Sequence, residues 1–296
     1  MYNNKHLIKR YGKSYYLATL FFPAHVSKDT MELYKFVRIP DQIVDGEVQD
    51  ANQLPIASNL EEHYSSAHAK LIKMRQERKL AYEEKNKRHV LRGDSVELFN
   101  RKEIPFEYSK AFFEAMLKDT TNHRYQTYEQ LKDYMYGSAS VVWLMMCHLI
   151  WCDRRALDYA DLLWEAMQLS NFLRDIREDY ESLWRIYIPE EDLKHYSLSH
   201  EDLIGFSKER RIDDNFTSFM KAYIAMNREQ YRKSLEWVKY LHPRGRRAVY
   251  LAAKLYEGIL DRIEANDYNV FGHSCRTTKR DKAKLLTKGL IDYIYH

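Results

Sequence analysis

Glycine, proline and cysteine are scarce in this chain, and each scarcity narrows the range of folds. The 296 residues include 9 glycines and 6 prolines, which leaves few points at which a chain of many short strands could turn. The 3 cysteines, Cys147, Cys152 and Cys275, form neither a CxxC pair nor a Cys/His ligand spacing. A disulfide framework or a zinc site is therefore not expected, and the composition favours a reducing cytoplasm.

The chain also lacks a large excess of positive or negative charge. Basic residues number 47 and acidic residues 43, for a net charge of +4, so no concentrated basic face is expected for a nucleic acid. Residues 1–13 lack the apolar stretch of a secretory signal. The most apolar stretch, residues 139–152, contains Ser140 and His148 and is shorter than the ~20 residues that cross a bilayer. We predict that it forms a core helix of a protein without nucleic-acid partners.

What is present is helical periodicity. Apolar residues make up 45% of the chain and recur at helical spacing over long stretches, with no sustained two-residue alternation. The length suits one large domain or two modest ones, and we expect one all-α domain over residues 1–296. Helices are expected at 14–45 with a break at Pro23, at 127–147 behind a capping box of Thr127 and Gln130, at 156–179, and from Pro189 and Pro243. The heavily charged stretch 61–92 is expected to form a solvated helix with a following loop.

Two pairs of aspartates stand four residues apart: Asp41 with Asp45, and Asp175 with Asp179. On a helix each pair projects from one face, with side chains about 5–6 Å apart. Four carboxylates on two opposed faces repel one another unless a divalent cation neutralises them. Mg²⁺ suits this role because it binds through a few carboxylates together with substrate phosphate oxygens. The alternative is a solvated helix face, which the same spacing often marks.

The residues around the second pair favour the metal interpretation. Asn171 falls in register with Asp175 and Asp179 on one helix face, with Gln168 near it, and a solvated face does not need an amide in register. Arg174 adds a donor that suits a diphosphate or an ordinary ion pair.

Several segments resemble the squalene, phytoene and dehydrosqualene synthase family. The family's first aspartate-rich region is similar to the segment SYYLATLFFPAHVSKDTMELYKFVRIPDQIVD of this chain. The family's central channel helix is similar to YQTYEQLKDYMYGSASVVW. The family's second aspartate-rich region is similar to QLSNFLRDIREDYESLWRIYIPEEDL. Its C-terminal end resembles AAKLYEGIL and the basic stretch that follows. The resemblance implies a single-domain isoprenoid synthase bundle, all helical, around a central hydrophobic channel.

The resemblance also assigns roles to individual residues. It implies that the metal ions are held by Asp41, Asp45, Asn171, Asp175 and Asp179. It implies that the substrates are contacted by Lys13, Tyr34, Arg38, Gln168, Asn171, Arg174, Tyr187, Tyr256 and Arg276. Tyr134 corresponds to the tyrosine placed near the carbocation. The first motif departs from the family pattern, since Gln42 replaces a usual second acid and Pro40 predicts a kink or break within the helix.

The implied activity is the joining of two geranylgeranyl diphosphates head to head, on Mg²⁺ or on Mn²⁺ in its place, to give phytoene. The intermediate is a cyclopropylcarbinyl diphosphate, and the final proton goes to diphosphate or to Tyr134. A reductive finish to squalene needs NADPH, which we do not expect because no GxGxxG fingerprint is present. The oily tails are expected in a channel lined by Val141, Val142, Leu144, Met145 and Leu149.

Other interpretations stay open. Within the family, a fifteen-carbon substrate gives dehydrosqualene or squalene. Outside enzymes, a catalytically silent member would act as a binding or assembly protein. The basic stretch 276–284 is either a peripheral contact with the inner membrane surface, at which oily substrates are exchanged, or a solvated helix end.

The tryptophans form the last pattern. All five fall where the family pattern leads us to expect glycine: Trp143, Trp151, Trp164, Trp184 and Trp237. One hypothesis is that the gene uses UGA as a glycine codon, which the printed sequence reads as tryptophan. The alternative is that the indoles are genuine and fill a reshaped pocket. An indole in a glycine-sized space is severe overpacking.

Overall fold

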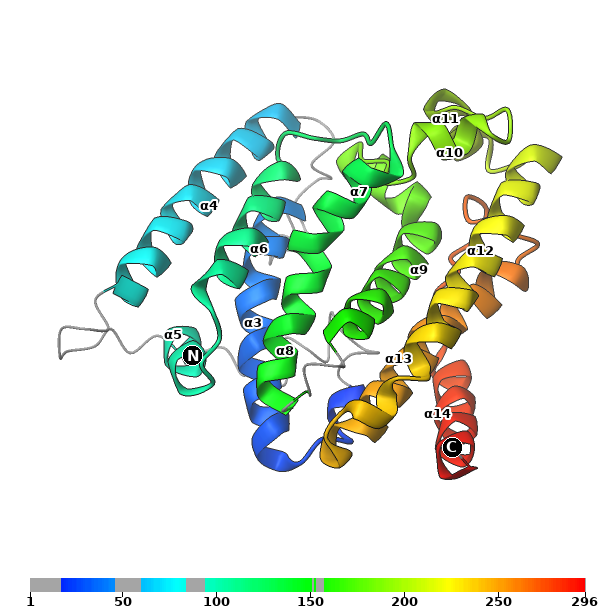
Figure 1. Ribbon diagram of the computed structural model, residues 1–296. Helices are drawn as coiled ribbons and strands as arrows, with labels where there is room; N and C mark the ends of the chain where they lie inside the picture. Colours follow the sequence, from blue (N-terminus) through cyan, green and yellow to red (C-terminus); the bar gives the residue numbers. More distant parts are fainter. Residues whose placement is uncertain (1–16, 46–59, 84–93, 151, 153–156, 296) are drawn as a thin grey trace.

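A computed structural model describes residues 17–45, 60–83, 94–150, 152 and 157–295 (Figure 1). The helices are α3 (Ala24–Asp45), α4 (Leu60–Glu83), α5 (Asp94–Arg101), α6 (Phe106–Lys118), α7 (Tyr128–Met135), α8 (Val141–Ile150), α9 (Leu157–Leu183), α10 (Glu190–Lys194), α11 (His200–Glu209), α12 (Asp214–Leu235), α13 (Pro243–Glu264) and α14 (Lys279–Tyr295). Within these residues, extended backbone pairs at one isolated bridge, between Arg124 and Ile186. The all-α prediction is confirmed.

Helix boundaries follow the local sequence signals, with two differences. The chain breaks before α3 at Pro23 as expected, but α3 continues through Pro40, so the break considered there does not occur. Thr127 caps α7 by accepting a hydrogen bond from the backbone N–H of Gln130 at 3.2 Å. The Gln130 amide oxygen accepts from the N–H of Gln126 at 2.9 Å instead of completing a capping box with Thr127.

A π-helical turn, η3 (Tyr136–Ser140), joins α7 to α8 and passes close to α6. A Cβ atom at Gly137 would lie 2.7 Å from the carbonyl oxygen of Ala111 and 2.7 Å from the Cβ of Ala115. Glycine is therefore required at this crossing, and the contact fixes α7 and α8 against α6.

Helix α9 lies between α8 on one side and α12 and α13 on the other (Figure 1). A buried polar cluster ties it to α12: the Ser170 hydroxyl lies 2.7 Å from Asn227 Oδ1 and 2.9 Å from Tyr231 Oη, and Asn227 Nδ2 donates to Ala166 O at 2.9 Å. The apolar stretch at α8 is buried, as predicted for a core helix. Among the residues that the structure describes, no helix combines the length and apolar character of a membrane span.

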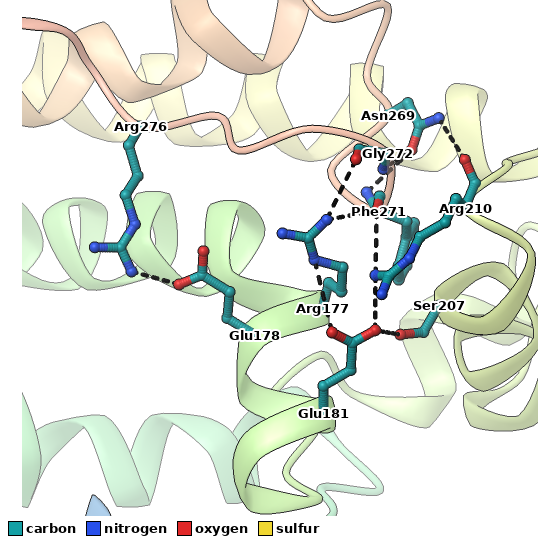
Figure 2. Close-up of polar contacts among 9 residues, drawn as sticks. All are labelled: Arg177, Glu178, Glu181, Ser207, Arg210, Asn269, Phe271, Gly272 and Arg276. Atoms are coloured by element: carbon teal, nitrogen blue, oxygen red, sulfur yellow. Dashed lines mark hydrogen bonds and ion pairs between the residues drawn. The ribbon is translucent and has the colours of Figure 1, made fainter. Parts of the chain in front are cut away.

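The loop after α13 is tied to the C-terminal half of α9 (Figure 2). Arg177 Nη1 donates to the carbonyl oxygen of Phe271 at 2.7 Å. Asn269 closes the loop, because its Oδ1 accepts from the N–H groups of Phe271 and Gly272 at 3.0 and 2.9 Å. These contacts bring Arg276 alongside α9.

Candidate active site

The C-terminal ends of α3 and α9 meet at one end of the bundle (Figure 1). Asp41 and Asp45 stand on the last turns of α3, and Asp175 and Asp179 on the last turns of α9. Arg185, two residues beyond α9, connects the two helices because its Nη1 donates to Asp45 Oδ1 at 3.2 Å. The structure thus brings together the two acidic pairs that the sequence set more than a hundred residues apart.

Burial and mutual repulsion weaken the acidity of two of these carboxyl groups. Loss of solvent raises the pKa of Asp45 to about 8, and the neighbouring Asp41 carboxylate adds to the rise. Loss of solvent also raises the pKa of Asp179 well above its usual value, with Asp175 and Asp45 as further causes. The nearby arginines do not offset this repulsion fully, so a divalent cation would relieve it.

The carboxylates pair with arginines and do not form a closed cage. Arg38 donates to Asp41, and Arg174 donates through Nε, at 2.7 Å, and Nη2 to the two oxygens of Asp175. Within the described residues, no three acidic, histidine or cysteine side chains converge as a ready-made metal site. Mg²⁺ commonly takes one or two carboxylates and fills its other positions with water and phosphate oxygens. The donor set therefore fits a metal that arrives with a diphosphate.

Arg185 is a site residue that the sequence did not reveal. Its side chain is buried, yet Nε and Nη2 have no acceptor, while Nη1 also reaches the Tyr187 hydroxyl at 3.4 Å. Buried guanidinium donors without acceptors are costly, and an anionic group would satisfy them. One signal was available: Arg185 follows the second acidic motif directly, inside the segment that resembles the family.

Four aromatic rings adjoin these charges: Tyr125, Tyr134, Phe172 and Tyr187. The Phe172 and Tyr187 centroids lie 4.2 Å apart, and those of Tyr134 and Tyr187 5.5 Å apart, with rings within 24° of parallel. Asp119 accepts hydrogen bonds from the hydroxyls of Tyr134 at 2.8 Å and Tyr187 at 3.3 Å. Aromatic faces attract cations, so the group suits a positively charged reacting carbon.

Asp119 was also missed from the sequence. It follows α6 as a single acid without a partner four residues away, so the spacing argument could not find it. Burial raises its pKa, and the hydrogen bonds from Tyr134 and Tyr187 work against that rise. A buried carboxyl that two tyrosines hold is able to receive a proton through either of them.

Other predicted residues share faces with the acidic pairs. Tyr34 and Arg38 stand on the α3 face of the first pair, and Gln168 and Asn171 on the α9 face of the second. Tyr256 of α13 faces Arg174: burial raises the tyrosine's pKa, and the guanidinium opposes the rise.

One predicted substrate contact is placed differently. Arg276 pairs with Glu178 and not with an aspartate of either pair, and its side chain is 64% exposed (Figure 2). Lys13 lies outside the described residues.

The apolar lining expected at Val141, Val142, Leu144, Met145 and Leu149 stays a prediction. Four of these side chains are packed into the core, and Leu144 is half-buried. A small cavity next to α9 and α13 is bordered on α8 by Trp143 and Met146.

Comparison with known proteins identifies the family. Residues 8–282 match the squalene/phytoene synthase family model. The chain belongs to the squalene/phytoene synthase family. As a member, it is a prenyltransferase.

Two relatives similar to this chain are phytoene synthases. This chain is 32% identical over 275 residues to the 15-cis-phytoene synthase of Synechocystis sp.. The aligned segment covers 88% of this chain and 76% of that relative. This chain is 29% identical over 286 residues to the phytoene synthase of Thermus thermophilus, and the alignment covers 96% of this chain and 90% of that relative.

Solved structures show the same fold. A dehydrosqualene synthase superimposes with a TM-score of 0.78 at 22% identity, over 99% of this chain and 96% of that one. A squalene synthase from Alicyclobacillus acidocaldarius gives 0.72 at 21% identity, over 90% and 95%. The isoprenoid synthase fold that the resemblance implied is confirmed.

Proposed function

We propose that this chain joins two molecules of geranylgeranyl diphosphate head to head to give phytoene. The observation that carries the proposal is the meeting of two acidic pairs, from α3 and α9, beside a buried aromatic group. The phytoene synthase names of its relatives support the twenty-carbon substrate.

The acidic pairs would hold Mg²⁺, or Mn²⁺ in its place, through Asp41, Asp45, Asp175 and Asp179, with Asn171 beside the second pair. When bound, the metal supplies positive charge that stabilises the departing diphosphate.

Arginines would hold the diphosphate as the bond from C1 to oxygen breaks. The unsatisfied Nε and Nη2 of Arg185 are available to its oxygens, and Arg38 and Arg174 lie beside the carboxylates. The leaving diphosphate keeps the electron pair, and the allylic cation remains next to the faces of Tyr134 and Tyr187. Because these rings are buried, water is kept from the cation.

The double bond of the second molecule attacks C1, and loss of one proton closes the cyclopropane ring. The second ionisation, rearrangement and loss of another proton complete the hydrocarbon. Tyr134 can accept a proton while it passes its own to Asp119, 2.8 Å away. Released diphosphate is the other acceptor. No step needs NADPH.

A fifteen-carbon substrate, giving dehydrosqualene or squalene, is the second candidate. One observation favours it: the indoles of Trp143 and Trp164 narrow the apolar end of the site. A shorter tail needs less of that space.

Exposed basic residues at the start of α14, including Lys279, Arg280 and Lys284, suit peripheral contact with an anionic membrane surface. Sedimentation with vesicles that contain anionic lipid tests this. Binding that is lost when the three residues are replaced by glutamine supports the contact, and binding that survives the replacement contradicts it.

The activity is tested by incubating the protein with geranylgeranyl or farnesyl diphosphate, with and without NADPH, and identifying the hydrocarbon by mass. We expect phytoene from the twenty-carbon substrate without NADPH when residues 143 and 164 are glycine, and no product after chelation of divalent metal. No hydrocarbon from either substrate, in the tryptophan or the glycine form described below, would overturn the proposal.

A further inference from the structure

Two tryptophans close the apolar end of the site. Trp143 of α8 and Trp164 of α9 stack with ring centroids 6.0 Å apart at an interplanar angle of 23°. The cavity that they border measures about 30 Å³. Ligand pockets measure roughly 300–1,000 Å³, and one water needs roughly 10–15 Å³. The space therefore admits about two waters, and it does not admit a prenyl tail.

The cavity lies in line with the second acidic pair. Trp164 shares its α9 face with Asp175, since a spacing of eleven residues returns to the same side of a helix. Eleven residues at ~1.5 Å each place the two positions about 16 Å apart along the axis. A substrate with its diphosphate near Asp175 and its tail along this face meets the indoles.

Helix α13 follows the same course. Ala248 and Ala252 line the cavity, and Tyr256, one turn further, faces Arg174 at the polar end. Two helices, α9 and α13, thus extend from the charged residues to the two indoles.

The surroundings of Trp143 do not suit an indole. The side chain is 5% exposed, and its Nε1 is buried with no acceptor. Buried tryptophan N–H groups ordinarily find an acceptor, and an unpaired one lowers stability. A smaller residue at this position would both remove the unpaired indole N–H and enlarge the cavity.

We propose that residues 143 and 164 determine how long a prenyl tail this enzyme accepts, and that glycine at both positions provides the twenty-carbon capacity. The inference rests on the proposed prenyltransferase function. With tryptophan at both positions, the tail ends at the stack. With glycine, the volume of two indoles is added to the cavity.

Residue 184 is one of six described non-glycine residues with a positive φ, a conformation that glycine adopts most easily. It has a φ of 53°, in the left-handed region, directly after α9. Its N–H donates to Tyr180 O at 2.9 Å, the hydrogen bond with which helices end on glycine. Its indole is 54% exposed, so packing does not compensate for the backbone conformation. We infer that residues 143, 164 and 184 are glycines encoded by UGA.

Competition between farnesyl and geranylgeranyl diphosphate tests the role of the pair. In the Trp143→Gly/Trp164→Gly protein, we expect the ratio of forty-carbon to thirty-carbon product to rise at least about tenfold over the tryptophan form. Trp143→Ala/Trp164→Ala provides the same space with less backbone freedom, in case the glycine variant does not fold. Trp237→Gly is the matched control, because Trp237 packs against Tyr240 and does not line the cavity.

The outcomes separate this inference from the proposed function. A product ratio that stays within about twofold in both folded double variants would overturn the role of the pair while leaving the function intact. A total lack of hydrocarbon in every form counts against the function instead. The codons decide the second inference: TGA at 143, 164 and 184 supports glycine, and TGG at these codons contradicts it.

Discussion

Both ends of the site contain buried donors without acceptors, but the two sets differ in what could satisfy them. At the polar end, Arg185 leaves Nε and Nη2 unpaired beside Asp45, where a diphosphate would supply oxygens. At the apolar end, Trp143 leaves an N–H unpaired against hydrocarbon, where a prenyl tail supplies nothing. The first unmet donor indicates a ligand, and the second indicates a residue that does not suit its place.

The polar end can be identified as a binding site even without substrate. Carboxylates of α3 and α9 lie close enough to repel one another, and the nearby arginines do not cancel this repulsion. Such an arrangement lowers the stability of the protein unless a ligand is bound. The apolar end contains no repulsion that a substrate would relieve.

Among single substitutions, the largest effect is expected at Arg185. Arg185→Met removes the buried donors, and we predict that kcat/KM falls on the order of 100-fold, with little recovery in Arg185→Lys because lysine lacks the planar fork. Steady-state kinetics measures this. Arg228→Met, which removes half-buried ion pairs to Asp261 and Glu264 on α13, is the control and should leave kinetics unchanged. Turnover of Arg185→Met within threefold of the parent would show that Arg185 does not bind the diphosphate.

A smaller effect is expected from Asp119. Asp119→Asn keeps an acceptor for one tyrosine hydroxyl but cannot receive a proton, so kcat should fall roughly tenfold while KM stays constant. Tyr134→Phe should give a similar loss, and the double variant should lose little more, since both residues act on one path. Additive losses in the double variant would mean that the two residues act separately.

The thermal stability should depend on pH and Mg²⁺ together. The folded protein keeps a proton on Asp45 up to about pH 8, whereas the unfolded chain loses it near the ordinary aspartate value. Stability without metal therefore falls as pH rises from about 4 to about 8. Mg²⁺ needs the ionised group, so the gain in Tm on its addition should grow by about 2 °C or more between about pH 6 and 8.5. Scanning calorimetry measures this, and a gain equal at both pH values would contradict it.

The smallest effect is expected at residue 184. Trp184→Gly should raise the free energy of unfolding by about 1 kcal/mol, because glycine adopts a positive φ without steric cost. Urea denaturation measures this. Trp184→Ala removes the indole but keeps the backbone strain, so equal stability of the two variants would show that the strain is not the cause.

Periodicity predicted the parts of this molecule that depend on local spacing. Asp175, Asp179 and Asn171 share a face because α9 is a regular helix, and the resemblance paired that face with Asp41 and Asp45. Contacts between residues far apart in the sequence leave no such periodic pattern. Asp119, which accepts hydrogen bonds from two tyrosines, is an example. The cavity lining depended on the rotation of α8, which its nearly uniform apolar sequence does not set.

The most direct test of the central claim is turnover of the Asp175→Asn/Asp179→Asn protein beside Asp133→Asn, a change of the same type on the exposed face of α7. The assay uses whichever prenyl diphosphate the parent converts, at saturating Mg²⁺. We predict a loss on the order of 100-fold or more in the double variant and unchanged turnover in the control. Hydrocarbon formation at the parent rate in a folded double variant would contradict the role of these helices.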